Sequence, residues 1–181
     1  MLVDGNLEAT SSSYFRVAQC RHGPDHNLIA YTADRNGSEN YALHIRDPHS
    51  GDDIELITET AHGDFVWASD GQTIFYTALD ENHRPNRVLR YRLGDDPADD
   101  IQVYREQDPE FFVDISKTES GRFIVITARD RAVTAELRVA PSASPTDNPM
   151  VVSERESGVD YSLSDDGDRF LILTNVDQAE D

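Results

Sequence analysis

The segment Asp70-Gly-Gln-Thr-Ile-Phe-Tyr-Thr-Ala-Leu-Asp80 decides the fold, because it joins a turn to a short apolar run and the chain repeats this combination. Related segments, each containing a closing threonine, occupy residues 25–32, 120–127 and 166–174. The spacings between successive closing threonines are 45, 50 and 47 residues, for Thr32, Thr77, Thr127 and Thr174. A period of this length is typical of the four-stranded blade of a β-propeller. We therefore expect an all-β chain built of propeller blades.

Each repeat contains short runs with strand character, separated by turn residues. The second run of each repeat is apolar at consecutive positions, which indicates burial on both faces, as in a blade between two neighbours. A two-layer sandwich would expose one face throughout. Asn36-Gly37 predicts a type I′ hairpin turn. The expected strands are 1–3, 14–20, 28–32, 41–46, 54–57, 65–67, 73–78, 87–93, 101–104, 111–115, 122–128, 136–139, 150–152, 159–163 and 170–173.

The repeat divides the chain into about three and a half antiparallel four-stranded blades of an incomplete ring. We expect the outer strand of a preceding blade at 1–10, whole blades at 11–62, 63–108 and 109–157, and the first half of a further blade at 158–181. An incomplete ring leaves a strand edge and apolar faces uncovered, so we expect it to associate with another copy through its open blades. We interpret the chain as a piece of a larger protein.

The composition restricts the function. The 181 residues include 35 acidic and 16 basic side chains, for a net charge of −19. A field of this sign repels nucleic acid and attracts cationic peptides, although a surface adapted for solubility is the simpler explanation. No stretch approaches the roughly 18 apolar residues of a membrane span, and the first residues do not resemble an export signal. We expect a cytoplasmic protein with neither a membrane nor a nucleic-acid partner.

Several residues are candidates for chemistry, and each has a simpler structural explanation. Cys20 lacks a local histidine signature and is expected to be a buried apolar residue. Asp165-Asp-Gly-Asp168 has some character of a calcium loop but falls where the repeat requires a hairpin turn. The acidic pairs Asp52-Asp53, Asp95-Asp96 and Asp99-Asp100 are expected in solvated loops.

The remaining candidates also favour structural roles. The histidines show no zinc-ligand spacing, so no metal or other cofactor is expected. Asn36-Gly-Ser38 matches a glycosylation sequon, which the hairpin turn explains better. Trp67 is expected to pack between blades. A cationic group is expected to pair with Asp80 and Glu81, although contacts to another domain or to a substrate carboxylate remain alternatives. The histidines are His22, His26, His44, His49, His62 and His83, and the cationic group is Arg84, Arg87, Arg90 and Arg92.

An ordered series of segments resembles the propeller domain of the prolyl oligopeptidase family of serine peptidases, and most of all its oligopeptidase B branch. The most specific part is Leu79-Asp-Glu-Asn-His-Arg-Pro85 followed by Arg90-Tyr-Arg-Leu-Gly94. Further matching segments are 2–6, 24–25 with 28–31, 37–41, 65–68, 75–76, 111–113 with 116–117, 161–162, 169–170 and 174–175. The resemblance extends over essentially the whole chain.

The resemblance implies a seven-bladed propeller stacked on an α/β-hydrolase domain, in which the propeller admits short peptides and excludes folded proteins. It also implies cleavage after Arg or Lys. The nucleophile of the family lies in a G-x-S-x-G elbow, a spacing that these 181 residues lack. No catalytic residue is therefore assigned here, and we expect this chain alone to be inactive. The alternative is a non-enzymatic propeller that scaffolds protein partners.

Overall fold

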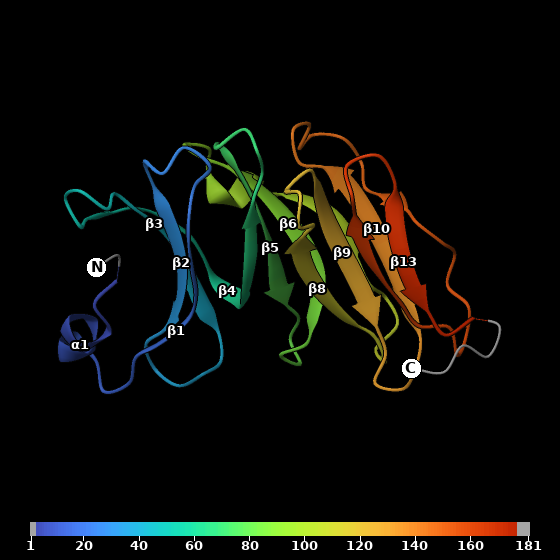
Figure 1. The fold of residues 1–181 in the computed structure, drawn as a ribbon. Coiled ribbons are helices and arrows are strands. Elements are labelled where there is room, and N and C mark those ends of the chain that lie inside the picture. Colours follow the sequence, from blue (N-terminus) through green and yellow to red (C-terminus); the bar gives the residue numbers. More distant parts are fainter. Residues whose placement is uncertain (1–2, 177–181) are drawn as a thin grey trace.

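The computed structural model describes residues 3–176, and it is an almost entirely antiparallel β structure. Figure 1 shows groups of strands that follow one another across the molecule, from the blue strands β1 and β2 at the left to the red strand β13 at the right. One short α-helix and two 3₁₀ turns complete the described elements, namely α1 (Gly5–Glu8), η1 (Ala9–Ser11) and η2 (Pro97–Asp99). The all-β prediction is confirmed.

The strands follow the sequence repeat closely. Their bounds are β1 Arg16–His22, β2 Ile29–Asp34, β3 Tyr41–Arg46, β4 Asp53–Trp67, β5 Thr73–Leu79, β6 Pro85–Arg92, β7 Ile101–Arg105, β8 Phe112–Lys117, β9 Phe123–Arg129, β10 Ala135–Pro141, β11 Met150–Val151, β12 Tyr161–Asp165 and β13 Phe170–Thr174. Every expected strand from residue 14 onward overlaps one of these, whereas the expected strand at 1–3 falls largely outside the described residues.

The strands pair as simple antiparallel meanders. Strands β1 to β7 form one sheet in chain order, β8 to β11 form a second, and β12 pairs with β13. Such an order results when each strand turns back beside its predecessor, as in a propeller blade. Three apolar clusters fill the structure. One lies around Phe65 and Trp67, the next joins Phe75 to Ile115, and the last joins Val139 to Tyr161.

The long strand β4 contains two of the expected strands, 54–57 and 65–67. Its first part pairs with β3 and its last part with β5, and the register shifts between Ala61 and Phe65. Gly63 sits in this irregularity with φ of 125°, a conformation that glycine adopts without strain. The chain thus changes pairing partner without leaving the strand. The division into blades at 62/63 and elsewhere stays a proposal, because the seven-stranded sheet is continuous there.

The burial of the second strands follows the expected pattern. Strands β2 and β5 are buried at every position. Strand β13 has the same apolar pattern, yet Leu171, Ile172 and Leu173 are 48%, 49% and 71% exposed. Phe170 packs against Phe123 of the third cluster, whereas these three residues of β13 stay largely uncovered among the described residues.

Two local predictions are wrong. Residues 5–11, most of which fall in the expected outer strand at 1–10, are helical, because the Asp4 carboxylate caps α1 by accepting hydrogen bonds from the amides of Asn6 and Leu7. Asn36-Gly37 does not form a type I′ hairpin, since a longer loop joins β2 to β3. The carboxylate of Asp34 closes that loop by accepting from the amides of Asn36, Gly37 and Glu39.

Candidate functional site

Three strands from different parts of the chain form one wall. The first is β1, the second is the end of β4, and the third is β8. Phe65 N–H donates to Gln19 Oε1 at 3.0 Å, and a Cβ placed on Gly63 would lie 3.1 Å from that of Ala18. Further along, Gly23 approaches the Trp67 ring. The matching order of these contacts shows that β1 and the end of β4 run in the same direction, as the first strands of neighbouring blades do.

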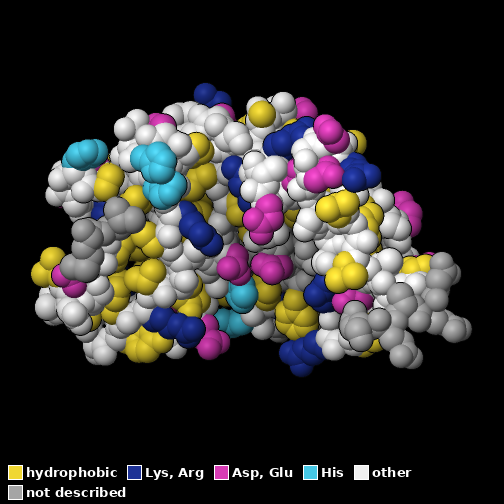
Figure 2. Space-filling view, viewed as in Figure 1, with side chains coloured by type: hydrophobic (Ala, Val, Ile, Leu, Met, Phe, Trp, Pro, Cys, Tyr) yellow, Lys and Arg dark blue, Asp and Glu magenta, His cyan; other side chains and the backbone are white. Residues whose placement is uncertain are grey.

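A hollow of about 600 Å³ opens on this wall. Its lining comes from β1, the end of β4 and β8, and it includes charged side chains of both signs. Figure 2 shows acidic side chains in magenta and histidines in cyan gathered in the hollowed middle of this face. The size suits a short peptide or a small organic ligand.

The beginning of the wall is acidic. Asp64 and Asp114 both line the hollow, and His62 contributes to the two smaller hollows that adjoin Asp64. His62 Nδ1 lies 3.3 Å from Asp64 Oδ2, and this hydrogen bond raises the pKa of His62. Desolvation by the surrounding wall, together with the charge of Asp64, raises the pKa of Asp114. Two carboxylates therefore lie at this part of the wall, although partial desolvation disfavours their charged form.

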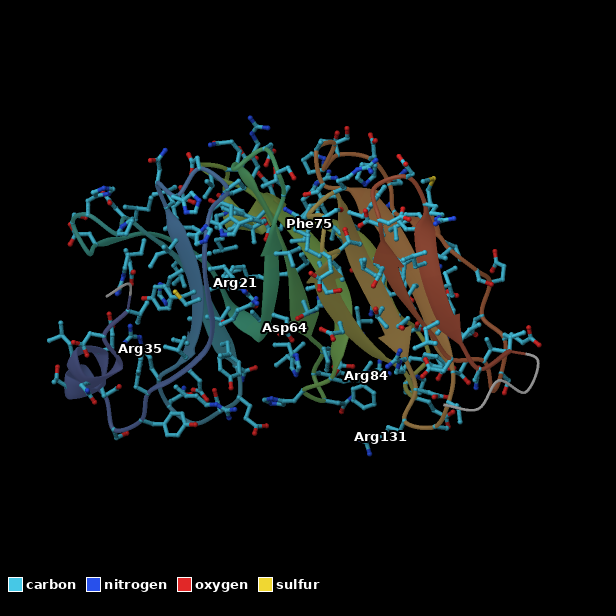
Figure 3. The ribbon with its side chains drawn as sticks, viewed as in Figure 1. Arg21, Arg35, Asp64, Phe75, Arg84 and Arg131 are labelled. Atoms are coloured by element: carbon cyan, nitrogen blue, oxygen red, sulfur yellow. The ribbon has the colours of Figure 1, made fainter. Side chains whose placement is uncertain are left out.

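The end of the wall is cationic. Arg21 on β1 and Lys117 at the end of β8 line the same hollow. Figure 3 labels Arg21 on β1 and, lower in the view, Asp64 at the end of β4, and both line this hollow. Burial lowers the pKa of Lys117, and Asp70 opposes that effect. The sequence reasoning missed this group, because Arg21 and Lys117 are 96 positions apart and share no motif.

Cys20 and Trp67 occupy structural positions. Cys20 is half-buried on β1, and burial raises the pKa of its thiol, which opposes nucleophilic chemistry. Trp67 is 5% exposed and packs in the first apolar cluster, so its expected packing role is confirmed. Its indole Nε1 is buried without a hydrogen-bond partner in the described part of the chain.

The acidic stretches serve the backbone and neighbouring side chains. Asp165 accepts a hydrogen bond from Ser120 Oγ, in the turn between β8 and β9, at 2.7 Å. It also accepts from the amide of Gly167, within the β12–β13 hairpin. Asp96 caps η2, and Asp100 accepts from the hydroxyl of Tyr76. Between residues 3 and 176, no group of three His, Cys, Asp or Glu side chains is arranged to hold a metal ion.

Asp53 contradicts its assignment to a solvated loop. Its carboxylate accepts from Arg46 Nε at 2.6 Å and from the hydroxyl of Tyr31 at 2.7 Å. Arg46 also binds Glu8 at 2.7 Å, which fastens α1 to the first sheet. No sequence pattern predicts this network, because its members come from four separate elements.

The four clustered arginines separate in space. Arg84 pairs with Asp80 at 3.1 Å, as expected, whereas the described ion pairs include none with Glu81. Arg87 donates to the Leu79 carbonyl, and Arg90 donates to the Pro145 carbonyl at 2.7 Å. Arg92 is exposed beside an acidic loop. Arg84 also donates to the Asp108 carbonyl at 2.8 Å, so three of the four satisfy backbone carbonyls, a role that charge counting does not predict.

The histidines also scatter. The rings of His22 and His26 stack at 4.0 Å, His44 stacks on Tyr31, and His49 lies in an exposed turn. Asn36-Gly-Ser38 lies in the exposed loop before β3, which leaves the glycosylation question untested. His62 alone among them joins the acidic group, and His83 lines the adjoining hollows.

Meandering blades side by side, with their first strands forming a charged wall, define the class of the protein as a β-propeller. Its residues 1–181 match the family described as the N-terminal β-propeller domain of prolyl oligopeptidase. The chain belongs to that family of peptidase propellers.

Individual peptidases are also similar to this chain in sequence or in structure. Protease 2 of Moraxella lacunata is 33% identical over 97% of this chain and 26% of its own length. Dipeptidyl aminopeptidase BI of Pseudoxanthomonas mexicana is 32% identical over 99% and 25%. Among solved structures, oligopeptidase B from Leishmania major superimposes with a TM-score of 0.91 at 25% identity, over 98% of this chain and 25% of that one. The chain thus spans about a quarter of the length of these relatives.

No helix among residues 3–176 is long and apolar enough to cross a membrane.

Proposed function

We propose that this chain is part of the propeller through which an oligopeptidase B-like serine peptidase admits short peptides, and that the peptidase cuts after Arg or Lys. Membership of the peptidase family supports the enzyme class. The acidic beginning of the wall, formed by Asp64 and Asp114, is the observation that supports basic substrates. A cytoplasmic location stays a prediction.

The charge of the wall provides the physical reason. A cleft lined by one sign of charge, in a protein of net charge −19, raises the local concentration of oppositely charged ligands. Desolvation strengthens the effect, because a carboxylate within a protein wall is screened less than one in open water. The local concentration of a basic peptide is therefore expected to rise at the entrance, before any chemistry takes place.

The catalytic serine, aspartate and histidine are proposed to come from outside this chain. The absence of a G-x-S-x-G spacing from the 181 residues supports this part of the proposal. A downstream reading frame that encodes such an elbow, followed by an aspartate and a histidine, is the expected finding. In the acyl-enzyme mechanism of this class, the histidine takes the proton of the serine hydroxyl as the serine attacks the peptide carbonyl.

The test uses the intact protein and paired fluorogenic substrates, one with Arg before the cleaved bond and one with Ala. We expect kcat/KM for the Arg substrate to exceed that for the Ala substrate and to fall as salt rises. Asp64→Asn combined with Asp114→Asn should lower kcat/KM for the Arg substrate alone. The matched control is Asp168→Asn in the exposed β12–β13 turn. Absence of hydrolysis of both substrates would favour the scaffold alternative.

A further inference from the structure

Arg21 and Lys117 are cations without counter-ions. Neither side chain forms a hydrogen bond or a close ion pair within the described part of the chain, although both line the same hollow and the charge of Asp70 acts on Lys117. Arg46, Arg84 and Arg155, in contrast, each pair with a carboxylate. In a chain with 35 acidic and 16 basic residues, two unpaired cations beside one hollow are unexpected. The packing of the fold does not account for them.

The desolvation of Lys117 strengthens this observation. Burial lowers its pKa and outweighs the opposing charge of Asp70, as expected for an ammonium group that has lost water without gaining a close ion pair. An incoming carboxylate would recover part of that cost, because charge-assisted hydrogen bonds strengthen where water is partly excluded. An anion that binds beside Arg21 and Lys117 would therefore be stabilised there.

The same hollow excludes a polyanion. Asp64 and Asp114 line its other end, and Asp114 and Lys117 are three positions apart on β8. At about 3.3 Å per residue, this offset corresponds to about 10 Å along the strand axis. A ligand that satisfies both ends carries a positive and a negative group at that separation. An extended peptide of about three residues spans the same distance.

We propose that the hollow binds short basic peptides by their free C-terminal carboxylate. The carboxylate lies at Arg21 and Lys117, and the basic group of the peptide lies at Asp64 and Asp114. This site deepens the proposed function and rests on it for the source of the peptides, but the binding itself requires no turnover. It orients a peptide along the wall and distinguishes free acids from peptides whose C-terminus is blocked.

The test measures binding of Arg-Gly-Gly to the intact protein by calorimetry, as the free acid and as the C-terminal amide, after treatment with a serine-directed phosphonate. Each partly exposed ion contact contributes only a few-fold in affinity, so we expect the acid to bind about fivefold more tightly than the amide. Arg21→Gln combined with Lys117→Gln should abolish this preference, because the acid then loses its cationic partners.

Two controls keep the result interpretable. Arg105→Gln removes an equal charge from an exposed position on β7 and should retain the preference. Arg21→Lys combined with Lys117→Arg retains both charges and should also retain it. Equal binding of acid and amide by the unaltered protein would overturn the proposal, as would a preference that survives in the double glutamine variant. A preference for the acid in a protein that hydrolyses no peptide would instead refute the proposed peptidase function alone.

Discussion

Glu106 and Arg155 form an ion pair, with Glu106 Oε2 and Arg155 Nη2 2.5 Å apart, between the end of β7 and the segment that precedes β12. The Glu106 side chain is 6% exposed and also accepts from the hydroxyl of Tyr104 at 2.7 Å. The Arg155 guanidinium lies 3.7 Å from the centre of the Phe111 ring. These contacts join neighbouring sheets where no backbone ladder connects them.

Removal of Arg155 alone should be costly. Arg155→Met leaves the Glu106 carboxylate buried without its cation, and we expect the free energy of unfolding to fall by about 3 kcal/mol. Addition of Glu106→Gln to that variant should recover part of the loss, because an amide costs less to bury than a lone carboxylate. Denaturant unfolding of the four proteins in the cycle measures the coupling. Equal stability of the single and double variants would contradict it.

The ion pair between Glu106 and Arg155 also predicts how the stability of the protein changes as the pH falls. Burial alone would raise the pKa of Glu106, but hydrogen bonds from Arg155 and nearby groups hold it below its usual value of 4.5. A lowered folded-state pKa means that the stabilisation is present above about pH 4.5 and is lost as the pH falls below it. Glu106→Gln should therefore flatten the loss of stability below pH 4.5. Melting temperatures between pH 3 and pH 7 provide the measurement.

Gly63 is expected to resist substitution more than other glycines of similar conformation. Its φ is 125°, and an added Cβ would lie 3.1 Å from that of Ala18 on β1. Gly63→Ala should lower the free energy of unfolding by about 1–3 kcal/mol through backbone strain, with close contact adding to it. Gly51→Ala is the control, because Gly51 has φ of 81° with no atom within 4 Å of its added Cβ. A cost no larger at Gly63 would argue against the close approach.

The order of the strands was predictable from the sequence because each one depends on local pattern. The apolar run at residues 73–78 is long enough to identify β5, and the alternation of Leu89 and Tyr91 identifies β6. The pairs of turn residues between the runs indicated where each strand begins and ends. Errors arose where a side chain overrides the local pattern. The Asp4 cap starts a helix within the segment expected to be an outer strand, and the Asp34 carboxylate organises a loop in place of a tight hairpin.

The charged wall was less predictable, because it depends on distances between repeats. The sequence indicated the excess of acid but not that Asp64 and Asp114, 50 positions apart, share one hollow. The pairing of Arg46 with Asp53 and Glu8 was likewise invisible, since each partner comes from a different element. A repeat fixes the position of strands, whereas contacts between repeats require the geometry of the ring.

Strand β13 predicts self-association of this chain. Leu171, Ile172 and Leu173 are 48–71% exposed on a strand whose equivalents β2 and β5 are fully covered. We expect light scattering to show a mass that rises with concentration, because exposed apolar strands associate. Leu171→Lys combined with Leu173→Lys should reduce that rise. A mass that stays at one chain across the concentration range would contradict the prediction.

His62 predicts how the acidic end of the wall responds to pH. The Asp64 hydrogen bond raises the pKa of His62 above its usual 6.5, with Asp114 and Glu39 adding to the effect. Below that raised pKa, the imidazolium offsets negative charge of Asp64 and Asp114, and above it the wall becomes more acidic. For the intact protein, the ratio of kcat/KM for Arg and Ala substrates should therefore rise as the pH passes upward through the His62 titration. The ratio cancels the titration of catalytic groups common to both substrates. His62→Gln should make the ratio of kcat/KM values independent of pH in this range. Asp64→Asn should lower the pH at which the proton resonances of His62 titrate. A ratio that still changes with pH in the His62→Gln protein would assign the effect to another group.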